Sequence, residues 1–365
     1  MRILMLATDA HGSVGGIAQY NRDVISALTA DPEVAEVVVL PRAIAEAPAG
    51  VPAKARYDAA ATGGIAAFAR RALAQAVCGG RFDLVFCAHV NLSPVATVAS
   101  RIARAPMVLA VHGIDAWTPP SRRLAVLATR SADLILSVSQ LTVDRMRAWL
   151  PGPRPPVAVV PNAVRLERFG MGRKAPDLVS RHHLAGKRVI MTLGRMAASE
   201  RAKGFDEVIE LMPRLRAHCP DLVYLCAGAG DDRQRLEAKA RDMARRTGCS
   251  DAVVFTGRIP EERKADYLRL ADAYVMASHW EGFGIVLIEA LACGVPVVGS
   301  TADATREALL NGELGPAVDP DDPDALAAAI LEALDRPRQV PERLSYYAFE
   351  NFQARLRAAL QPLLS

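Results

Sequence analysis

The sequence predicts an α/β protein made of two domains, each a doubly wound parallel sheet. Three observations predict this fold class. Apolar runs of strand length alternate with helix-length segments, which is typical of a parallel sheet covered on both faces. The chain has 365 residues, too many for one compact core and suited to two ordinary domains. Residues 151–176, rich in proline, glycine and charge, interrupt the alternation and indicate a domain break.

The individual elements follow from these runs, since strands buried on both faces are apolar throughout. In the first half we expect strands at 1–7, 36–40, 83–88, 107–111, 134–139 and 157–160, and helices at 17–30, 65–77, 93–104, 121–130 and 141–150. In the second half we expect strands at 188–194, 222–228, 252–257, 273–278 and 296–300, and helices at 206–218, 233–248, 261–271, 284–294 and 348–364.

These elements define the expected domains. The first is 1–165, a hinge follows at 166–186, and the second is 187–345. We expect a C-terminal helix, at about 346–365, to pack back on the first domain. Doubly wound, Rossmann-like sheets place their ligands at the carboxyl ends of their strands. If the two sheets face one another, the cleft between them is the expected site.

Composition excludes several classes of protein. With 51% hydrophobic and 23% charged residues, the chain is globular and not disordered. No run of 18 apolar residues occurs, so we expect no membrane-spanning helix. The apolar run at the N-terminus is too short for a signal peptide, and no small-residue cleavage site follows it. The six cysteines form no CxxC pair, and reduced, mostly buried thiols in a cytoplasmic protein are expected.

Positive charge is concentrated in the first half. Residues 1–165 carry 17 Lys+Arg against 11 Asp+Glu, and the remainder carries 27 against 29. A basic half with the helices 65–77 and 121–130 would suit an anionic membrane surface or an acidic acceptor. An arginine-rich solvated surface without a partner explains the same counts. We expect no nucleic-acid partner.

The strongest chemical signal lies in residues 277–300. A strand leads into a polar loop, where Gly282 and Gly284 loosen the backbone before a helix begins near Ile285. The free N–H groups and the dipole of such a helix favour an anion. Glu281 could accept from sugar hydroxyls, and Glu289 could accept from both hydroxyls of a ribose. A helix cap and a dipole-complementing charge are the alternatives.

A pair of cations forms the second signal. Arg195 follows the strand at 188–194, and Lys203 precedes a helix. A fork-shaped donor beside a mobile point charge could bracket a diphosphate and stabilise charge that develops on a leaving group. Two solvated surface charges are the alternative.

The first half contributes weaker signals. Gly12, Gly15 and Gly16 form a glycine-rich turn between the first strand and helix, although GxxGG is not the dinucleotide fingerprint. His112 lies just past a strand, where it could donate to a sugar hydroxyl or a phosphate, or could simply be a satisfied polar group. The Pro-Asn turn at 161–162 is expected to be structural.

Together these motifs resemble the retaining glycosyltransferases of the GT-B fold numbered family four. The segment EGFGIVLIEALACGVPVV is similar to the Glu-x7-Glu segment of that family, and LGR…KGFD, PNAV…F and the early GG follow in the family's order. The resemblance covers nearly the whole chain and implies a nucleotide-sugar donor.

The resemblance also implies roles for individual residues. Gly15 and Gly16 would approach the donor phosphate and the acceptor, and His112 would lie beside the transferred sugar. Arg195 and Lys203 would hold the diphosphate, and Glu281 would contact the sugar. The remaining donor-binding positions would be Gly282, Phe283, Gly284, Ile285, the ribose-binding Glu289, and Arg258 and Ile259 beside the base.

Two departures from the family pattern are visible. Arg195 and Lys203 are eight residues apart, a longer spacing than is common, and the insert ASERA is expected to loop out. The usual GG-x-x-E after the last strand is missing, and GSTADATRE offers Thr301, Thr305 and Glu307 instead. Phosphate contacts from this loop would have to come from backbone N–H groups and threonine hydroxyls.

The resemblance implies retention at the anomeric carbon, and we favour front-face substitution. His112, Arg195, Lys203 and Glu281 would be the catalytic residues. A DxD-type motif at a strand end would suggest a metal, but Asp319-Pro-Asp-Asp lies in a late loop and looks like a helix cap. No cofactor or essential metal is therefore expected. The expected activity is hexosyl transfer, with GDP-mannose favoured by family habit, to a saccharide or polyprenyl-linked acceptor in bacterial polysaccharide synthesis. A sugar-nucleotide epimerase, a phosphorylase of the same fold and a non-catalytic binder are the alternatives.

Overall fold

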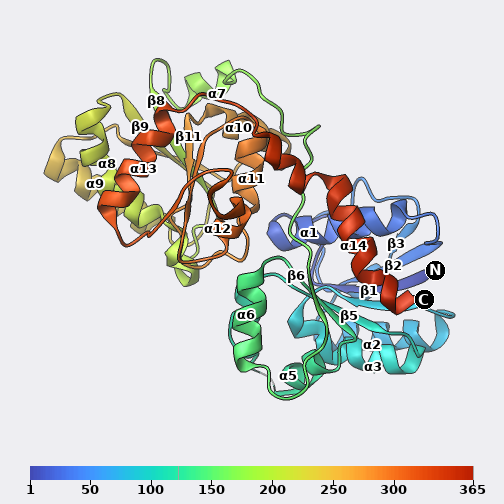
Figure 1. The fold of residues 1–365 in the computed structure, drawn as a ribbon. Coiled ribbons are helices and arrows are strands. Elements are labelled where there is room, and N and C mark those ends of the chain that lie inside the picture. Colours follow the sequence, from blue (N-terminus) through green and yellow to red (C-terminus); the bar gives the residue numbers. More distant parts are fainter. Residues whose placement is uncertain (122, 365) are drawn as a thin grey trace. The chain divides into compact units, whose positions relative to one another are not determined.

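A computed structural model describes residues 1–121 and 123–364 and contains two compact units. Unit 1 comprises Met1–Ala163 together with the segment from Phe349 onward, and unit 2 is the continuous segment Val164–Ala348 (Figure 1). Each unit is a single parallel sheet with helices on both faces. The predicted fold class, two Rossmann-like doubly wound sheets, is therefore confirmed.

Unit 1 contains a seven-stranded sheet in the order β3-β2-β1-β4-β5-β6-β7, with all neighbours parallel. Its strands are β1 Arg2–Ala7, β2 Glu36–Pro41, β3 Ala55–Tyr57, β4 Leu84–Cys87, β5 Met107–Val111, β6 Leu134–Ser137 and β7 Val157–Val159. Its helices are α1 Gly16–Ala30, α2 Ile65–Cys78, α3 Ser93–Ala103, α4 Ile114–Trp117, α5 Arg123–Arg130, α6 Gln140–Trp149 and α14 Phe349–Leu364, with 3-10 turns at Ala59–Ala61 and Val90–Leu92.

Alternate residues of β1 serve two separate cores, as the period of a strand requires. Leu4 and Leu6 pack with α2 and α3 on one face. Ile3 points to the other face, which α1 and α14 cover. Both faces of the strand are therefore buried, which explains why the N-terminal run is apolar throughout.

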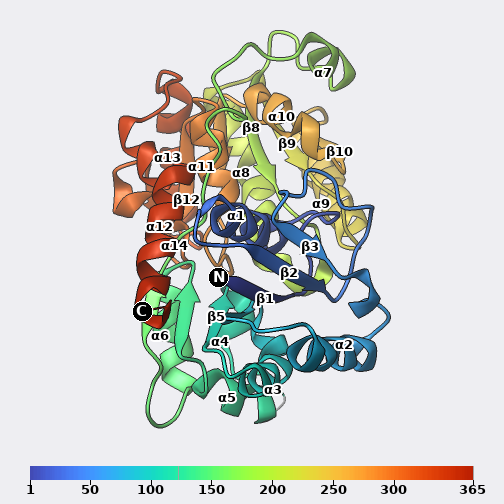
Figure 2. The same cartoon turned by 90° about the vertical axis from the view of Figure 1, so that its right-hand side faces the viewer.

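Unit 2 contains a six-stranded parallel sheet in the order β10-β9-β8-β11-β12-β13. Its strands are β8 Arg188–Leu193, β9 Leu222–Ala227, β10 Val253–Gly257, β11 Ala273–Val275, β12 Val297–Ser300 and β13 Ala317–Val318. Its helices are α7 Pro176–Arg181, α8 Phe205–His218, α9 Arg233–Thr247, α10 Lys264–Leu270, α11 Ile285–Ala292, α12 Thr305–Ala308 and α13 Pro323–Asp335, with 3-10 turns at Ala198–Lys203, Glu261–Arg263, Leu310–Gly312 and Glu342–Tyr347. Helices α8, α9 and α13 cover one face, and α10, α11 and α12 cover the other (Figures 1 and 2).

The segment expected to be a hinge, 166–186, belongs to unit 2 by its contacts. Arg168 donates to Glu261 at 2.9 Å, and Lys174 Nζ lies 2.7 Å from Asp272 Oδ2. Asp177 pairs with Arg263 at 3.0 Å. These side-chain ion pairs attach the segment to α10 and its flanking turns, so the boundary between the units falls at Val164.

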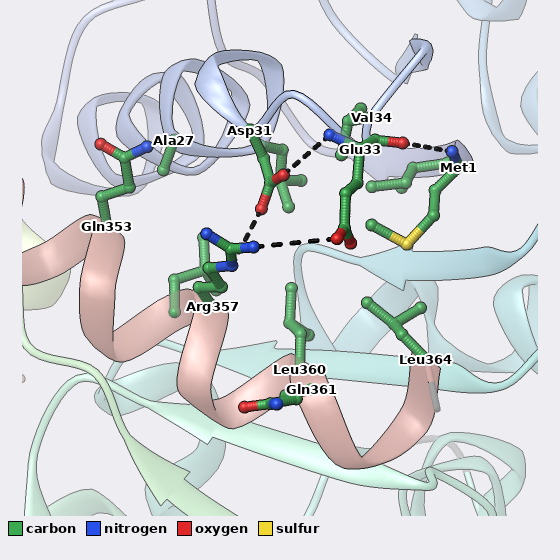
Figure 3. Close-up of a pocket in the computed structure, with 13 residues that line it drawn as sticks. Met1, Ala27, Asp31, Glu33, Val34, Gln353, Arg357, Leu360, Gln361 and Leu364 are labelled. Atoms are coloured by element: carbon green, nitrogen blue, oxygen red, sulfur yellow. Dashed lines mark hydrogen bonds and ion pairs between the residues drawn. The ribbon is translucent and has the colours of Figure 1, made fainter.

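The C-terminal helix α14 completes unit 1 by packing against α1. Phe352, Leu356 and Leu360 are buried, and the Phe352 ring meets the Tyr20 ring edge-to-face at 5.6 Å. Beyond these contacts the two helices leave a cavity of about 450 Å³, where Arg357 lies 3.4 Å from Asp31 (Figure 3). The C-terminal residues thus supply a core layer of the unit that contains the N-terminus.

All six cysteines are free, and four of them are buried, whereas Cys78 is exposed and Cys249 is half-buried. Within the described residues, no helix combines the length and the apolar character needed to cross a membrane.

Candidate functional site

Loops at the carboxyl edge of the unit 2 sheet are joined through their backbones. Gly228 has φ +124°, and a Cβ there would lie 1.9 Å from the carbonyl oxygen of Gly194. A Cβ on Gly230 would likewise lie 1.9 Å from the carbonyl oxygen of Met196. Only glycine permits so close an approach. These contacts fix the segment that carries Arg195, whose side chain is exposed at this edge.

Two residues that were predicted to act on the donor meet at the same edge. Lys203 Nζ donates to Glu281 Oε2 at 2.9 Å, and it also lies 3.4 Å from the carbonyl oxygen of Trp280. Both side chains are mostly buried, with 17% and 24% exposed. The insert ASERA therefore does not separate Lys203 from the site, since the chain returns through a 3-10 turn, Ala198–Lys203, that ends beside Glu281.

A buried carboxylate that the sequence did not indicate holds the Glu281 loop. Asp303 Oδ2 accepts from the Ser278 hydroxyl and from the Glu281 backbone N–H, the latter at 2.9 Å. Its other oxygen accepts from the backbone N–H and the hydroxyl of Thr305, at 3.0 and 2.7 Å. Burial raises the pKa of Asp303 to about 6. Asp303 thus joins the loop after β11 to the loop after β12.

This network corrects the role suggested for Thr305. Its hydroxyl was expected to contact phosphate, but the residue is fully buried. The hydroxyl is bonded to Asp303 and lies 2.8 Å from the backbone N–H of Ser300. Thr301 is exposed and Glu307 is half-buried.

The glycine-started helix exists as predicted. Gly284 caps α11 with φ +92°, and a Cβ there would lie 3.0 Å from Thr305 Cγ2. Gly282 and Phe283 are buried before it, and Ile285 is the first helical residue. The Phe283 ring packs edge-to-face on Tyr347 at 5.4 Å. Helix α11 therefore begins four residues after Glu281, at the same sheet edge as the Lys203–Glu281 pair.

Glu289 lies inside α11 and is 3% exposed. Lys264, the first residue of α10, places Nζ 2.6 Å from Glu289 Oε2. Burial raises the pKa of Glu289, and the ammonium of Lys264 opposes that rise. Sequence reasoning missed Lys264, because the contact depends on how α10 packs against α11.

The segment predicted to flank a base follows β10 at this edge. Arg258 is exposed and Ile259 is half-buried. The Gly228 N–H donates to the Gly257 carbonyl at 3.0 Å. This bond attaches Gly257, the residue before Arg258, to the loop after β9.

In unit 1, the predicted glycine turn lies at the start of α1. Gly15 is the N-cap and Gly16 the first helical residue, and both are exposed. A Cβ on either glycine would meet no other atom within 4 Å. Packing within the chain does not require glycine at Gly16, so the open space there is available to a ligand.

His112 lies at the carboxyl end of β5 with a defined tautomer. Its Nε2 is 2.9 Å from the Ala88 carbonyl, which can only accept, so Nε2 carries the hydrogen. Burial lowers the pKa of His112 to about 4. The neutral ring therefore presents Nδ1 as an acceptor, which corrects the donor role suggested by the sequence.

Two further groups accompany His112 that the sequence did not single out. Asp115 Oδ1 accepts from the His112 backbone N–H at 3.0 Å, and the His89 ring lies 6.4 Å from the His112 ring. Burial raises the pKa of Asp115 to about 6. Among the described residues, His112 Nδ1 and Asp115 Oδ2 are buried without a hydrogen-bond partner. His89 and Asp115 follow the carboxyl ends of β4 and β5. This position after a buried strand is the sequence signal that could have identified them as site residues.

The acidic loop before α13 was predicted to be a helix cap, and this is confirmed. Asp322 accepts from the backbone N–H groups of Asp324 and Ala325, both at 3.0 Å. Asp321 pairs instead with His279 at 3.0 Å. Across the described ranges, no three His, Cys, Asp or Glu side chains are grouped so that they could hold a metal ion.

Comparison with known proteins places the chain in a family. The family of glycosyl transferases group 1 matches residues 180–351, and glycosyltransferase family 4 matches residues 14–168. A GDP-mannose-dependent alpha-(1-6)-phosphatidylinositol monomannoside mannosyltransferase of Mycolicibacterium smegmatis is 31% identical over 300 residues, which are 77% of this chain and 75% of the relative. The chain therefore belongs to the group 1 glycosyltransferases of the GT-B fold.

Two other comparisons agree with this placement. A GDP-mannose-dependent monoacylated alpha-(1-6)-phosphatidylinositol monomannoside mannosyltransferase of Corynebacterium glutamicum is 28% identical over 92% of this chain and 89% of its own. The crystal structure of Anabaena HepE in complex with UDP is 20% identical and covers 99% of this chain and all of its own, with a TM-score of 0.73. At that identity the second likeness shows the fold.

Proposed function

We propose that this glycosyltransferase transfers mannose from GDP-mannose, with retention, to a saccharide or lipid-linked saccharide acceptor. The observation that carries the proposal is the gathering of Arg195, the Lys203–Glu281 pair, the α11 N-terminus and Glu289 at one sheet edge of unit 2. Cations and a helix N-terminus suit a diphosphate, and carboxylates suit sugar and ribose hydroxyls. The names of the two mannosyltransferase relatives support GDP-mannose as the donor.

The proposed reaction is a front-face substitution. The bond between the anomeric carbon and the diphosphate oxygen breaks, and the acceptor oxygen forms its bond on the same face. The acceptor's proton passes to the departing diphosphate oxygen. Arg195 and Lys203 stabilise the charge that develops there, so the reaction needs no metal. Lys203 has three N–H donors, which allows it to hold Glu281 and a phosphate oxygen together. His112 accepts from a substrate hydroxyl through Nδ1.

Binding of nucleoside diphosphates tests this proposal. In the presence of EDTA, GDP at 100 times its Kd should stabilise the protein by about 2.7 kcal/mol, seen as a rise in Tm. Glu289→Gln should reduce the shift, because it weakens binding, whereas Glu332→Gln, on the exposed face of α13, should leave it unchanged. A shift with UDP or ADP in place of GDP would overturn the choice of donor. No shift with any nucleoside diphosphate would favour a non-catalytic protein. Turnover of the nucleotide sugar without an acceptor would favour an epimerase.

We also propose that unit 1 contacts the anionic inner face of the plasma membrane, where a lipid-linked acceptor of bacterial polysaccharide synthesis is presented. Helix α3 packs between α2 and α5. On these helices several large apolar side chains are exposed beside arginines: Val98 and Ile102 near Arg101, and Leu124 and Leu127 near Arg123. Apolar side chains that enter an interface and cations that meet acidic headgroups suit such a surface.

Vesicle binding tests the membrane contact. The protein should sediment with phosphatidylglycerol vesicles and not with phosphatidylcholine vesicles, and high salt should weaken the binding. The double variant Leu124→Asn, Leu127→Asn should lose it, whereas Val340→Asn, an exposed apolar position of unit 2, should not. Equal sedimentation of the double variant and the wild type would contradict the assignment of this surface.

A further inference from the structure

The buried ion pair between α10 and α11 has no role in the chemistry described so far. Lys264 Nζ lies 2.6 Å from Glu289 Oε2, and the two side chains are 13% and 3% exposed. Helix α11 also carries the proposed diphosphate-binding N-terminus, one turn before Glu289. A lysine that is buried against the one carboxylate assigned to the ribose is therefore placed to control that carboxylate.

Lys264 is the dominant charge facing Glu289. Glu261, on the turn before α10, and Arg168, on the segment before α7, also act on it with opposite signs. These two are bonded to one another at 2.9 Å, so their charges largely offset each other. Tyr274 of β11 faces the same carboxylate and stays protonated, because burial raises its pKa. Cys293, at the end of α11, likewise stays neutral because burial raises its pKa to about 11.

The position of Lys264 is itself fixed by its surroundings. Its Nζ lies 6.0 Å from the centre of the Phe169 ring, and Phe169 is 4% exposed. The ring limits the movement of the ammonium on one side, and the carboxylate holds it on the other. The two contacts restrict the ammonium before any ligand arrives, which reduces the ordering cost of binding.

The ionisation of Glu289 matters for the ligand it is proposed to hold. An ionised carboxylate is acceptor-only, with about four lone-pair sites on its two oxygens. Glu289 Oε2 is buried and makes no hydrogen bond to a described residue, its contact with the ammonium being an ion pair, so acceptors remain for two hydroxyls. A protonated carboxyl would present a donor where the ribose also presents donors. Burial without a positive partner would favour that protonated form.

We propose that Lys264 is a positioning residue of the donor site, which holds the Glu289 carboxylate ionised and oriented to accept from both hydroxyls of the nucleotide ribose. This inference rests on the proposed function, because it takes Glu289 as the ribose ligand.

Calorimetric titration with GDP from pH 6 to pH 8 tests the inference, with UDP in parallel. Apart from the titration of the terminal phosphate of GDP, which all variants share, wild-type affinity should change little over this range. Lys264→Met should bind more weakly as the pH falls, because the Glu289 carboxyl then protonates within the range. Below its raised pKa, each pH unit should cost about tenfold in affinity. Lys264→Arg should restore the flat profile.

Two further variants separate positioning from direct contact. Lys264→Gln keeps a hydrogen-bond donor but loses the charge, so it should show the same pH dependence and serves if the methionine variant does not fold. In a Glu289→Gln background, Lys264→Met should change the affinity less than twofold, because its effect passes through the carboxylate.

Each contrary result has a distinct meaning. If the wild type binds GDP, Glu289→Gln weakens binding and both neutral variants of Lys264 keep a flat profile, the inference is wrong and the proposed function stands. If Lys264→Met weakens GDP binding equally with and without Glu289, the lysine contacts the nucleotide directly and the positioning role is wrong. If the wild type binds neither GDP nor UDP, the proposed function fails and the inference fails with it.

Discussion

Replacing Lys203 with alanine is expected to lower kcat/KM for sugar transfer by about a hundredfold to a thousandfold, the usual effect of removing one preorganised donor from a developing negative charge. Two consequences of the substitution act together. The leaving diphosphate loses a cation, and Glu281 loses the partner that lies 2.9 Å from its carboxylate. The effect should therefore appear mainly in kcat, since the charge on the leaving group is greatest in the transition state.

A matched lysine provides the control. Lys239, on α9 of the same unit, also forms an ion pair, at 3.0 Å from Asp206, but lies outside the site. Lys239→Ala should leave kcat/KM within about twofold, because Lys239 pairs with carboxylates of α8 outside the site. Steady-state transfer assays on both variants make the comparison. Near-normal turnover in Lys203→Ala would show that the pair with Glu281 is structural.

Phe352→Ala is expected to lower the free energy of unfolding of unit 1 by about 3–5 kcal/mol, the usual range for a buried phenylalanine. Phe352 is fully buried between Tyr20 and Phe349, with ring distances of 5.6 and 6.2 Å. Tyr20 in turn packs edge-to-face on His112 at 5.1 Å. Truncating the ring thus removes a core layer and also loosens the support of a site residue.

The tryptophans allow this effect to be assigned to one unit. Trp117 and Trp149 lie in unit 1 and Trp280 lies in unit 2. In a Trp280→Phe background, fluorescence during urea unfolding reports unit 1 alone. Gln361→Ala, at an exposed position of α14, should shift the transition by less than about 0.5 kcal/mol. An unchanged midpoint for Phe352→Ala would mean that α14 does not stabilise unit 1 in solution.

The sequence predicted those parts of the fold that depend on long apolar runs. Nearly every central strand was visible, because burial on both faces makes its residues continuously apolar. The edge strands β3 and β13 were not predicted, since three and two residues are too few to show a pattern. The domain break was visible as proline and charge, but the attachment of 166–186 to unit 2 depends on ion pairs between residues almost a hundred positions apart.

The residues of the candidate site likewise fall into those that a local sequence pattern indicated and those that depend on tertiary contacts. Arg195, Lys203, Glu281 and Glu289 could be proposed from the sequence because they lie beside predicted strand and helix ends or within the motif at 281–289. Asp303 and Lys264 could not, because each acts through a contact made in tertiary structure. Asp303 reaches a loop 22 residues away from its own, and Lys264 reaches the next helix. No local pattern distinguishes such residues from ordinary surface charges.

The division of the chain between the units also determines the order in which they can fold during synthesis. Unit 2 is continuous and can fold once Ala348 has left the ribosome, whereas unit 1 must wait for α14 although most of it is made first. At the usual rate of elongation, roughly ten to forty seconds separate the synthesis of Ala163 from that of Phe349. During this interval the face of α1 that α14 will cover is exposed to chaperones and proteases. A chain that lacks α14 would therefore have its defect in unit 1, the unit that contains residues 1–163.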